Sequence, residues 1–144
     1  MAILNYTTSI DSEKTIAEIQ KCLAKHGANK ITTDYDANRI PCAVTCCITL
    51  NENLIAFALP ANSDGVLKAM RKSKVPNSKC TPEQAQRVAW RIIKDWVEAQ
   101  MAIVEAQLAE VTEVFLPYAI TKNGQTVYKE IKESGMVALN SSNN

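Results

Sequence analysis

The stretch TPEQAQRVAWRIIKDWVEAQMAI, from Thr81 to Ile103, predicts one long helix around which the rest of the fold is arranged. Thr81 suits the N-cap, Pro82 the first turn, and Gln84 stands at the capping-box position. With about 100° of rotation per residue, one narrow arc collects an apolar stripe. Its members are Ala85, Val88, Ala89, Ile92, Trp96, Ala99 and Ile103. We expect the helix to continue to about Ala109, roughly 40 Å at about 1.5 Å per residue.

The segments before this helix predict a helix followed by an antiparallel meander. Residues 12–26 are apolar at helical spacing, and Gly27 follows where a left-handed C-cap belongs. Three runs then alternate with the period of two that is typical of strands, in residues 31–35, 42–50 and 55–59. The breaks between them, DANRIP and NEN, are short and rich in turn formers, which favours three antiparallel strands with one apolar face.

The remaining segments predict small helical elements. A short helix capped by Asn62 or Ser63 follows the strands, and the chain loosens at KSKVPNSKC. After the long helix, an apolar connection ends at Pro117, a turn falls at residues 122–124, and a small helix ends at Gly135. The sequence therefore predicts an α+β fold in one domain, residues 1–139, with a frayed tail at residues 140–144.

Composition restricts where the protein acts. Sixteen basic and fifteen acidic residues give a net charge of +1, so an anion site must come from the placement of a few side chains, not from a polybasic surface. The N-terminus lacks the basic start and apolar run of an export signal, and no stretch approaches about 18 apolar residues. We therefore expect a cytoplasmic protein with no membrane partner and with reduced cysteines.

The cysteines do not predict a metal or catalytic site. On a strand, Cys42 and Cys46 face one side and Cys47 the other, and the single histidine, His26, stands at a helix end. The chain lacks the GxSxG, HExxH, P-loop and GxGxxG motifs. We therefore expect inert thiols, no metal or cofactor, and no enzymatic activity.

Arg87, Arg91 and Lys94 fall on the polar side of the long helix. One interpretation needs no function, because Arg91 with Asp95 and Lys94 with Glu98 form pairs four residues apart, each worth roughly 0.2 to 0.5 kcal/mol. It leaves Arg87 and Arg91 as like charges one turn apart, a slightly repulsive spacing unless an anion lies between them. Guanidinium groups bind phosphate bidentately, so this pair is the leading candidate for a ligand site.

A second basic group lies earlier in the chain. Arg71 and Lys72 belong to a run of five positive charges between Lys68 and Lys79 that no acidic residue interrupts. The run is either a solvated loop or, if it lies near Arg87, part of a nucleic-acid footprint.

Trp90 and Val97 form a second apolar flank on the long helix. Either the VFLPYAI segment folds back to cover this flank, or the flank is exposed and forms an interface. On the second interpretation we expect a homo-oligomer, or contact with a partner through Trp90, Val97 and the neighbouring Glu98.

The stretches NYTTSIDSEKTIAEIQ, FALPANSDGVLKAM and QRVAWRIIKDWVEAQMAIVEAQ, followed by VFLPY, resemble a family of small uncharacterised proteins that recur in bacteriophage and prophage genomes. The likeness extends from about Ala2 to Leu139. It implies a phage-encoded protein in the cytoplasm of a bacterial host, acting in phage DNA metabolism or against host immunity, and it implies no catalytic residue. The strand CAVTCCITL departs from the aliphatic and aromatic content usual in the family, which further weakens a thiol or metal function.

The leading hypothesis is a non-enzymatic phage accessory protein that binds a nucleic acid or a nucleotide. The residues expected to hold the phosphate are Arg87, Arg91, Lys94, Arg71 and Lys72. The alternative is a protein inhibitor that covers the surface of a host defence complex through Trp90, Glu98 and Glu105.

Overall fold

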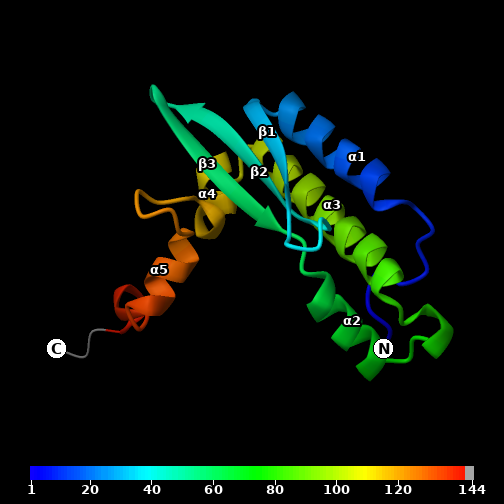
Figure 1. Ribbon diagram of the computed structural model, residues 1–144. Coiled ribbons are helices and arrows are strands. Elements are labelled where there is room, and N and C mark those ends of the chain that lie inside the picture. The colour runs from blue at the N-terminus through cyan, green and yellow to red at the C-terminus, as the bar shows by residue number, and fades with distance from the viewer. Residues whose placement is uncertain (142–144) are drawn as a thin grey trace.

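A computed structural model describes residues 1–141 as a three-stranded sheet with five α-helices, which confirms the predicted α+β class (Figure 1). In chain order the elements are α1 (Ser12–Lys25), β1 (Ala28–Tyr35), β2 (Pro41–Leu50), β3 (Asn53–Pro60), α2 (Ser63–Lys72), η1 (Asn77–Lys79), α3 (Pro82–Glu105), α4 (Val111–Phe115), η2 (Leu116–Tyr118), α5 (Val127–Glu133) and η3 (Val137–Leu139). Of the predicted tail at residues 140–144, the last three residues lie outside the described part of the chain.

The sheet is the predicted antiparallel meander, in the order β1-β2-β3. Leu50 pairs with Asn53, so Asn51 and Glu52 form a two-residue hairpin turn with φ of 49° and 69°. Positive φ at both central residues is the type I′ geometry that matches the twist of a hairpin. At the other end, Oδ1 of Asp36 accepts hydrogen bonds from the backbone N–H groups of Asn38 and Ile40 at 2.8 and 3.0 Å. Local turn chemistry therefore sets the register of all three strands.

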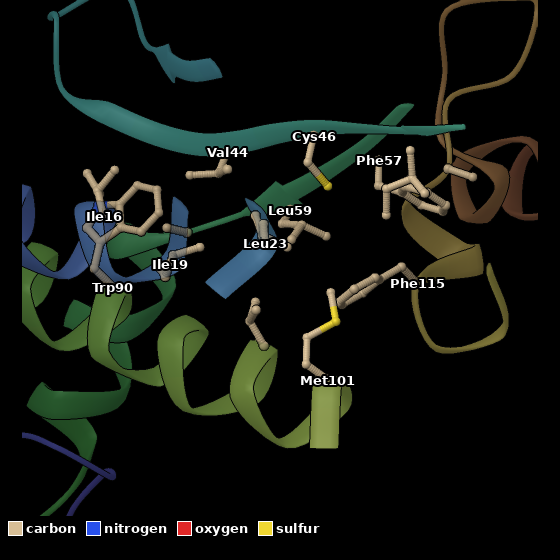
Figure 2. Packing of buried hydrophobic residues seen from close by; sticks show 14 of the residues in the cluster. Ile16, Ile19, Leu23, Val44, Cys46, Phe57, Leu59, Trp90, Met101 and Phe115 are labelled. Atoms are coloured by element: carbon tan, nitrogen blue, oxygen red, sulfur yellow. The ribbon is translucent and has the colours of Figure 1, made fainter. Parts of the chain in front are cut away.

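Both α1 and α3 cover the same face of this sheet. Alternate residues of β2, among them Val44 and Cys46, point into a core that Ile19 and Leu23 of α1 enter from one side and Met101 of α3 from below (Figure 2). The two helices run in the same direction, because Arg91 of α3 faces the start of α1 while Glu105 of α3 faces its end. The core thus lies between one sheet face and a pair of parallel helices.

Helix α3 begins as predicted but ends one turn early. The Thr81 hydroxyl accepts a hydrogen bond from the Gln84 N–H at 3.2 Å, as expected of an N-cap. The expected end near Ala109 is wrong, because the chain turns at Gln107 with φ of 60°. Glu110 then caps the new helix α4 in a reciprocal capping box with Glu113.

The predicted apolar stripe of α3 is buried only in its first turns. Ala85, Val88 and Ala89 are buried, but Ala99 is exposed, and the buried residues of the second half are Val97 and Met101. The reason is a change of neighbours along the helix. Its first half packs against α2, whereas Val97 and Met101 of its second half share a core with α1, the sheet and Phe115 of α4.

The first half of α3 shares a second, smaller core with α2 and the N-terminal segment. This core contains Met70, Val75, Ala85 and Val88, with Ile3 and Tyr6 packed against them. Gln84 also holds the N-terminal segment, because its side-chain amide donates to the carbonyl groups of Tyr6 and Thr8 at 2.8 Å each.

The C-terminal helical module joins the body of the protein at α4 and the edge of β3. Phe115 is buried, and the Ile120 N–H donates to the Ala56 carbonyl at 2.8 Å. The predicted turn at residues 122–124 is confirmed, with Gly124 at φ 77°, and the Thr126 hydroxyl caps α5. In Figure 1, α5 extends away from the sheet and the long helix.

Candidate functional site

A groove runs between α1 and the second half of α3, and we call it the α1–α3 groove. Its volume is about 580 Å³, which lies in the range of small-molecule sites. From α1 and the residue after it, the lining residues are Glu18, Lys21, Cys22, Lys25 and His26. From α3 they are Arg91, Lys94, Glu98, Met101, Ala102 and Glu105. The groove is therefore lined mainly by charged side chains, with Cys22, Met101 and Ala102 as its apolar residues.

Arg91 reaches this groove, but its charge is already paired. Its Nη1 lies 2.8 Å from Oε2 of Glu18 and 3.4 Å from the Thr15 hydroxyl, and only 15% of the side chain is exposed. The expected pair with Asp95 does not form. Asp95 instead accepts a hydrogen bond from the Asn5 side chain at 2.9 Å. Arg91 therefore ties α3 to α1, which is a structural role.

Lys94 also lines the groove and makes the predicted pair with Glu98, with Nζ and Oε1 3.0 Å apart. Its Nζ lies 3.9 Å from Oε2 of Glu18 as well, so Glu18 lies between two cations. The carboxylates of Glu18 and Glu98 are thus both engaged by basic residues of α3.

Arg87 and Arg91, the predicted pair, have separate partners in the structure. Nε of Arg87 donates to the side-chain oxygen of Gln84 at 3.0 Å, and Arg87 does not line the groove. Arg71 and Lys72 are exposed in the last turn of α2, at the N-terminal end of α3, whereas the groove follows its C-terminal half (Figure 1). Of the five predicted ligand residues, the fold brings only Arg91 and Lys94 together.

The residues that the sequence argument missed are Lys21 and Lys25 of α1. Both are exposed, both line the groove, and they stand one helical turn apart. Neither makes an ion pair with a carboxylate of residues 1–141. Lys21 and Lys25 show the same sequence pattern as Arg87 and Arg91, namely two like charges four residues apart. A basic residue at a helix C-terminus also favours the helix dipole, which accounts for Lys25 without a ligand but not for Lys21.

His26 lies at the C-terminal end of the groove. Its Nδ1 lies 2.8 Å from the carbonyl oxygen of Cys22, and its Nε2 lies 2.5 Å from Oε1 of Glu105. Because a carbonyl oxygen can only accept, Nδ1 carries a proton. When Nε2 is protonated as well, His26 and Glu105 form an ion pair between the ends of α1 and α3. All three carboxylates of the groove therefore have a partner within the protein.

Three of the five thiols, those of Cys22, Cys42 and Cys46, have a raised pKa. Burial, followed by the negative charge of Glu98, raises the pKa of Cys22, which lines the groove. Burial raises the pKa of Cys46 from its usual 9.0 to about 11, and burial followed by the charge of Asp36 raises that of Cys42. A raised pKa keeps a thiol protonated and unreactive at neutral pH. Across residues 1–141, no three His, Cys, Asp or Glu side chains are grouped so as to hold a metal ion.

The predicted interface residues are largely buried. Trp90 is 1% exposed and Val97 is 0% exposed, so the expectation that they offer apolar surface to a partner is wrong. Figure 2 shows Trp90 packed beside Ile16 and Ile19 of α1. The VFLPY segment does fold back, but onto Trp96, whose ring centroid lies 5.3 Å from those of Phe115 and Tyr118. Glu98 is exposed, but it is paired with Lys94.

Comparison of the chain with family models, curated proteins and solved structures finds no match. The resemblance to phage proteins therefore stays a prediction. Within the described residues, no helix combines the length and the apolar character needed to cross a membrane.

Proposed function

We propose that this is a non-enzymatic phage accessory protein that binds a small phosphate-bearing ligand in the α1–α3 groove. Lys21 and Lys25 contact the phosphate. Lys94 adds positive charge from the opposite wall, and Arg91 holds the two helices at a fixed spacing. This assignment keeps the class of ligand that the sequence predicts and moves its centre from α3 to α1.

The observation that carries the proposal is the charge pattern of the groove. Four Lys and Arg side chains and His26 line the groove together with three carboxylates, and each carboxylate has a basic partner, Glu18 in Arg91, Glu98 in Lys94 and Glu105 in His26. Among the described residues, the basic side chains of the groove that have no carboxylate partner are Lys21 and Lys25. Two ammonium groups one turn apart repel each other, and an anion between them reverses the sign of that interaction.

The placement of the basic residues favours a small ligand over a nucleic acid. A nucleic-acid surface needs several cations spread along the phosphate backbone. Arg71, Lys72 and Arg87 lie outside the groove, so they do not continue the line of Lys21 and Lys25. We therefore expect binding to a nucleotide-sized phosphate compound with a modest dependence on salt.

Calorimetric titration with inorganic pyrophosphate tests the proposal. In the double variant Lys21→Gln/Lys25→Gln we expect affinity to fall about 30-fold, because each lost contact of about 1 kcal/mol is a factor of about five. The matched control is Lys14→Gln/Lys30→Gln, which removes the same charge from exposed positions of α1 and β1 outside the groove. Equal losses in both variants, or no binding to the unaltered protein, would refute a site in the groove.

The alternative function, inhibition of a host defence complex, loses part of its basis. Trp90 and Val97 are buried, and Glu98 and Glu105 are held by Lys94 and His26. Pull-down from infected cells still separates the two functions, because an inhibitor retains a host protein whereas a small-ligand binder retains a phosphate compound.

A further inference from the structure

A second groove begins where the first one ends, and we call it the hairpin groove. It lies between the β2–β3 hairpin on one side and the segment from Val104 to Glu113 on the other, with a volume of about 1130 Å³. His26 lines both grooves. Lys25, which lines the α1–α3 groove, immediately precedes His26 in the chain. The two hollows thus meet at one end of α1.

The large apolar residues that line the hairpin groove are all aliphatic. These are Ile48, Leu50, Ile55, Val104, Leu108 and Val111. Leu108, which follows the end of α3, is 77% exposed, so its side chain is available for contact with an apolar ligand. None of the described residues that line the groove is Phe, Tyr or Trp, and its one ring, the His26 imidazole, is held between the Cys22 carbonyl oxygen and Glu105. A nucleobase would therefore find no Phe, Tyr or Trp ring to stack on, whereas an alkyl chain could contact the aliphatic side chains that line the groove between its polar residues.

The charges of the hairpin groove also exclude a second anionic group. Its acidic residues are Glu110 and Glu113, and Oε1 of Glu113 accepts a hydrogen bond from the Glu110 N–H at 2.9 Å. Its only basic side chain among the described lining residues is His26, whose Nε2 is directed at Glu105. An anionic group is therefore attracted to Lys21 and Lys25, whereas in the hairpin groove it would be repelled by Glu110 and Glu113.

We propose that the ligand of this protein is an anionic amphiphile, a phosphate monoester with a single aliphatic chain. The phosphate lies between Lys21 and Lys25, and the chain passes His26 and lies in the hairpin groove against Leu108. The inference rests on the proposed function, since it uses the same phosphate site, and it narrows the ligand from phosphate compounds in general to alkyl phosphates.

A series of alkyl phosphates of increasing chain length, kept below the concentrations at which they form micelles, tests the inference by calorimetry. Full burial of a methylene corresponds to about a fourfold gain in affinity, and a chain half buried in an open groove gains about twofold per methylene. From butyl to octyl phosphate we therefore expect affinity to rise by about 15-fold or more. Adenosine monophosphate serves as the nucleotide comparison and is expected to bind no more tightly than butyl phosphate.

Two further comparisons separate the head from the chain. Leu108→Gln is expected to weaken octyl phosphate several-fold while leaving pyrophosphate unchanged, and Leu4→Gln, at another exposed leucine outside both grooves, is the matched control. Lys21→Gln/Lys25→Gln is expected to weaken both ligands. Octyl glucoside, with the same chain and no charge, is expected to bind at least tenfold more weakly than octyl phosphate.

The outcomes distinguish this inference from the proposed function. If pyrophosphate binds through the lysines but affinity is independent of chain length, or adenosine monophosphate binds more tightly than octyl phosphate, the amphiphile is refuted and the phosphate site stands. If octyl glucoside binds as well as octyl phosphate, the role of the head group is refuted. If no phosphate compound binds, both proposals fail.

Discussion

The partner of Arg91 provides the sharpest test of the structural reasoning. The sequence pairs Arg91 with Asp95 four residues along the same helix, whereas the structure pairs it with Glu18 of α1 at 2.8 Å. Two double-mutant cycles separate these alternatives, one with Arg91→Met and Glu18→Ala, the other with Arg91→Met and Asp95→Ala. Methionine keeps the length and apolar stem of the arginine and removes the charge.

The expected magnitudes follow from exposure. Arg91 is 15% exposed and the Glu18 side chain 35%, so the pair is stronger than a surface ion pair but still partly screened by water. We expect a coupling free energy of about 1 kcal/mol between Arg91 and Glu18 and a value near zero between Arg91 and Asp95. Glu18→Ala should cost about 1 to 2 kcal/mol, more than Arg91→Met, because it leaves a half-buried cation with only the Thr15 hydroxyl as partner.

Urea unfolding monitored by tryptophan fluorescence measures these free energies, with the urea dependence checked for equality across the variants. A coupling with Asp95 as large as that with Glu18 would refute the assignment. The same variants bear on function. Arg91→Met that keeps full stability yet abolishes pyrophosphate binding would show that Arg91 contacts the ligand and is not a structural tie.

Two further predictions concern local features of the fold. Between the usual thiol pKa of 9.0 and the folded value of about 11 for Cys46, the unfolded chain releases a proton that the folded protein keeps, so this stabilisation is complete below pH 9 and lost as the pH rises toward 11. Under reducing conditions, the unfolding free energy of the unaltered protein should therefore fall with pH more steeply than that of Cys46→Val, by up to about 1.4 kcal/mol per pH unit. Parallel curves for the two proteins would show that folding does not raise the pKa of Cys46. Gly27→Ala should destabilise by about 1 kcal/mol, since Gly27 has φ of 103° with open space around it, whereas Gly65→Ala in helix α2 meets only ordinary contact at 3.4 Å and should be neutral or stabilising. Thermal unfolding measures both, and equal shifts would contradict the backbone explanation.

The contrast between Trp90 and Trp96 shows how far helical periodicity reaches. The sequence places Trp96 in the core stripe and Trp90 on a flank, yet Trp90 is fully buried and Trp96 is only partly so. Periodicity reports which side chains share a face of α3. It does not report that α1 and the sheet close over the flank of Trp90 while the η2 turn supplies Tyr118 to cover Trp96.

The sequence by itself determined the elements whose signals lie within one turn of the chain. The Thr81 cap, the glycine after α1 and the alternation of the strands each depend on contacts between residues a few positions apart, so residue type and spacing suffice to predict them. The candidate site is different. Glu18 and Arg91 are 73 residues apart, and His26 and Glu105 are 79 apart. Only the packing of α1 along α3 decided that these residues pair. The same packing left Lys21 and Lys25 beside a groove without a carboxylate partner among residues 1–141. An ion pair between two helices produces no periodic pattern in the sequence of either helix, so residue spacing could not predict it.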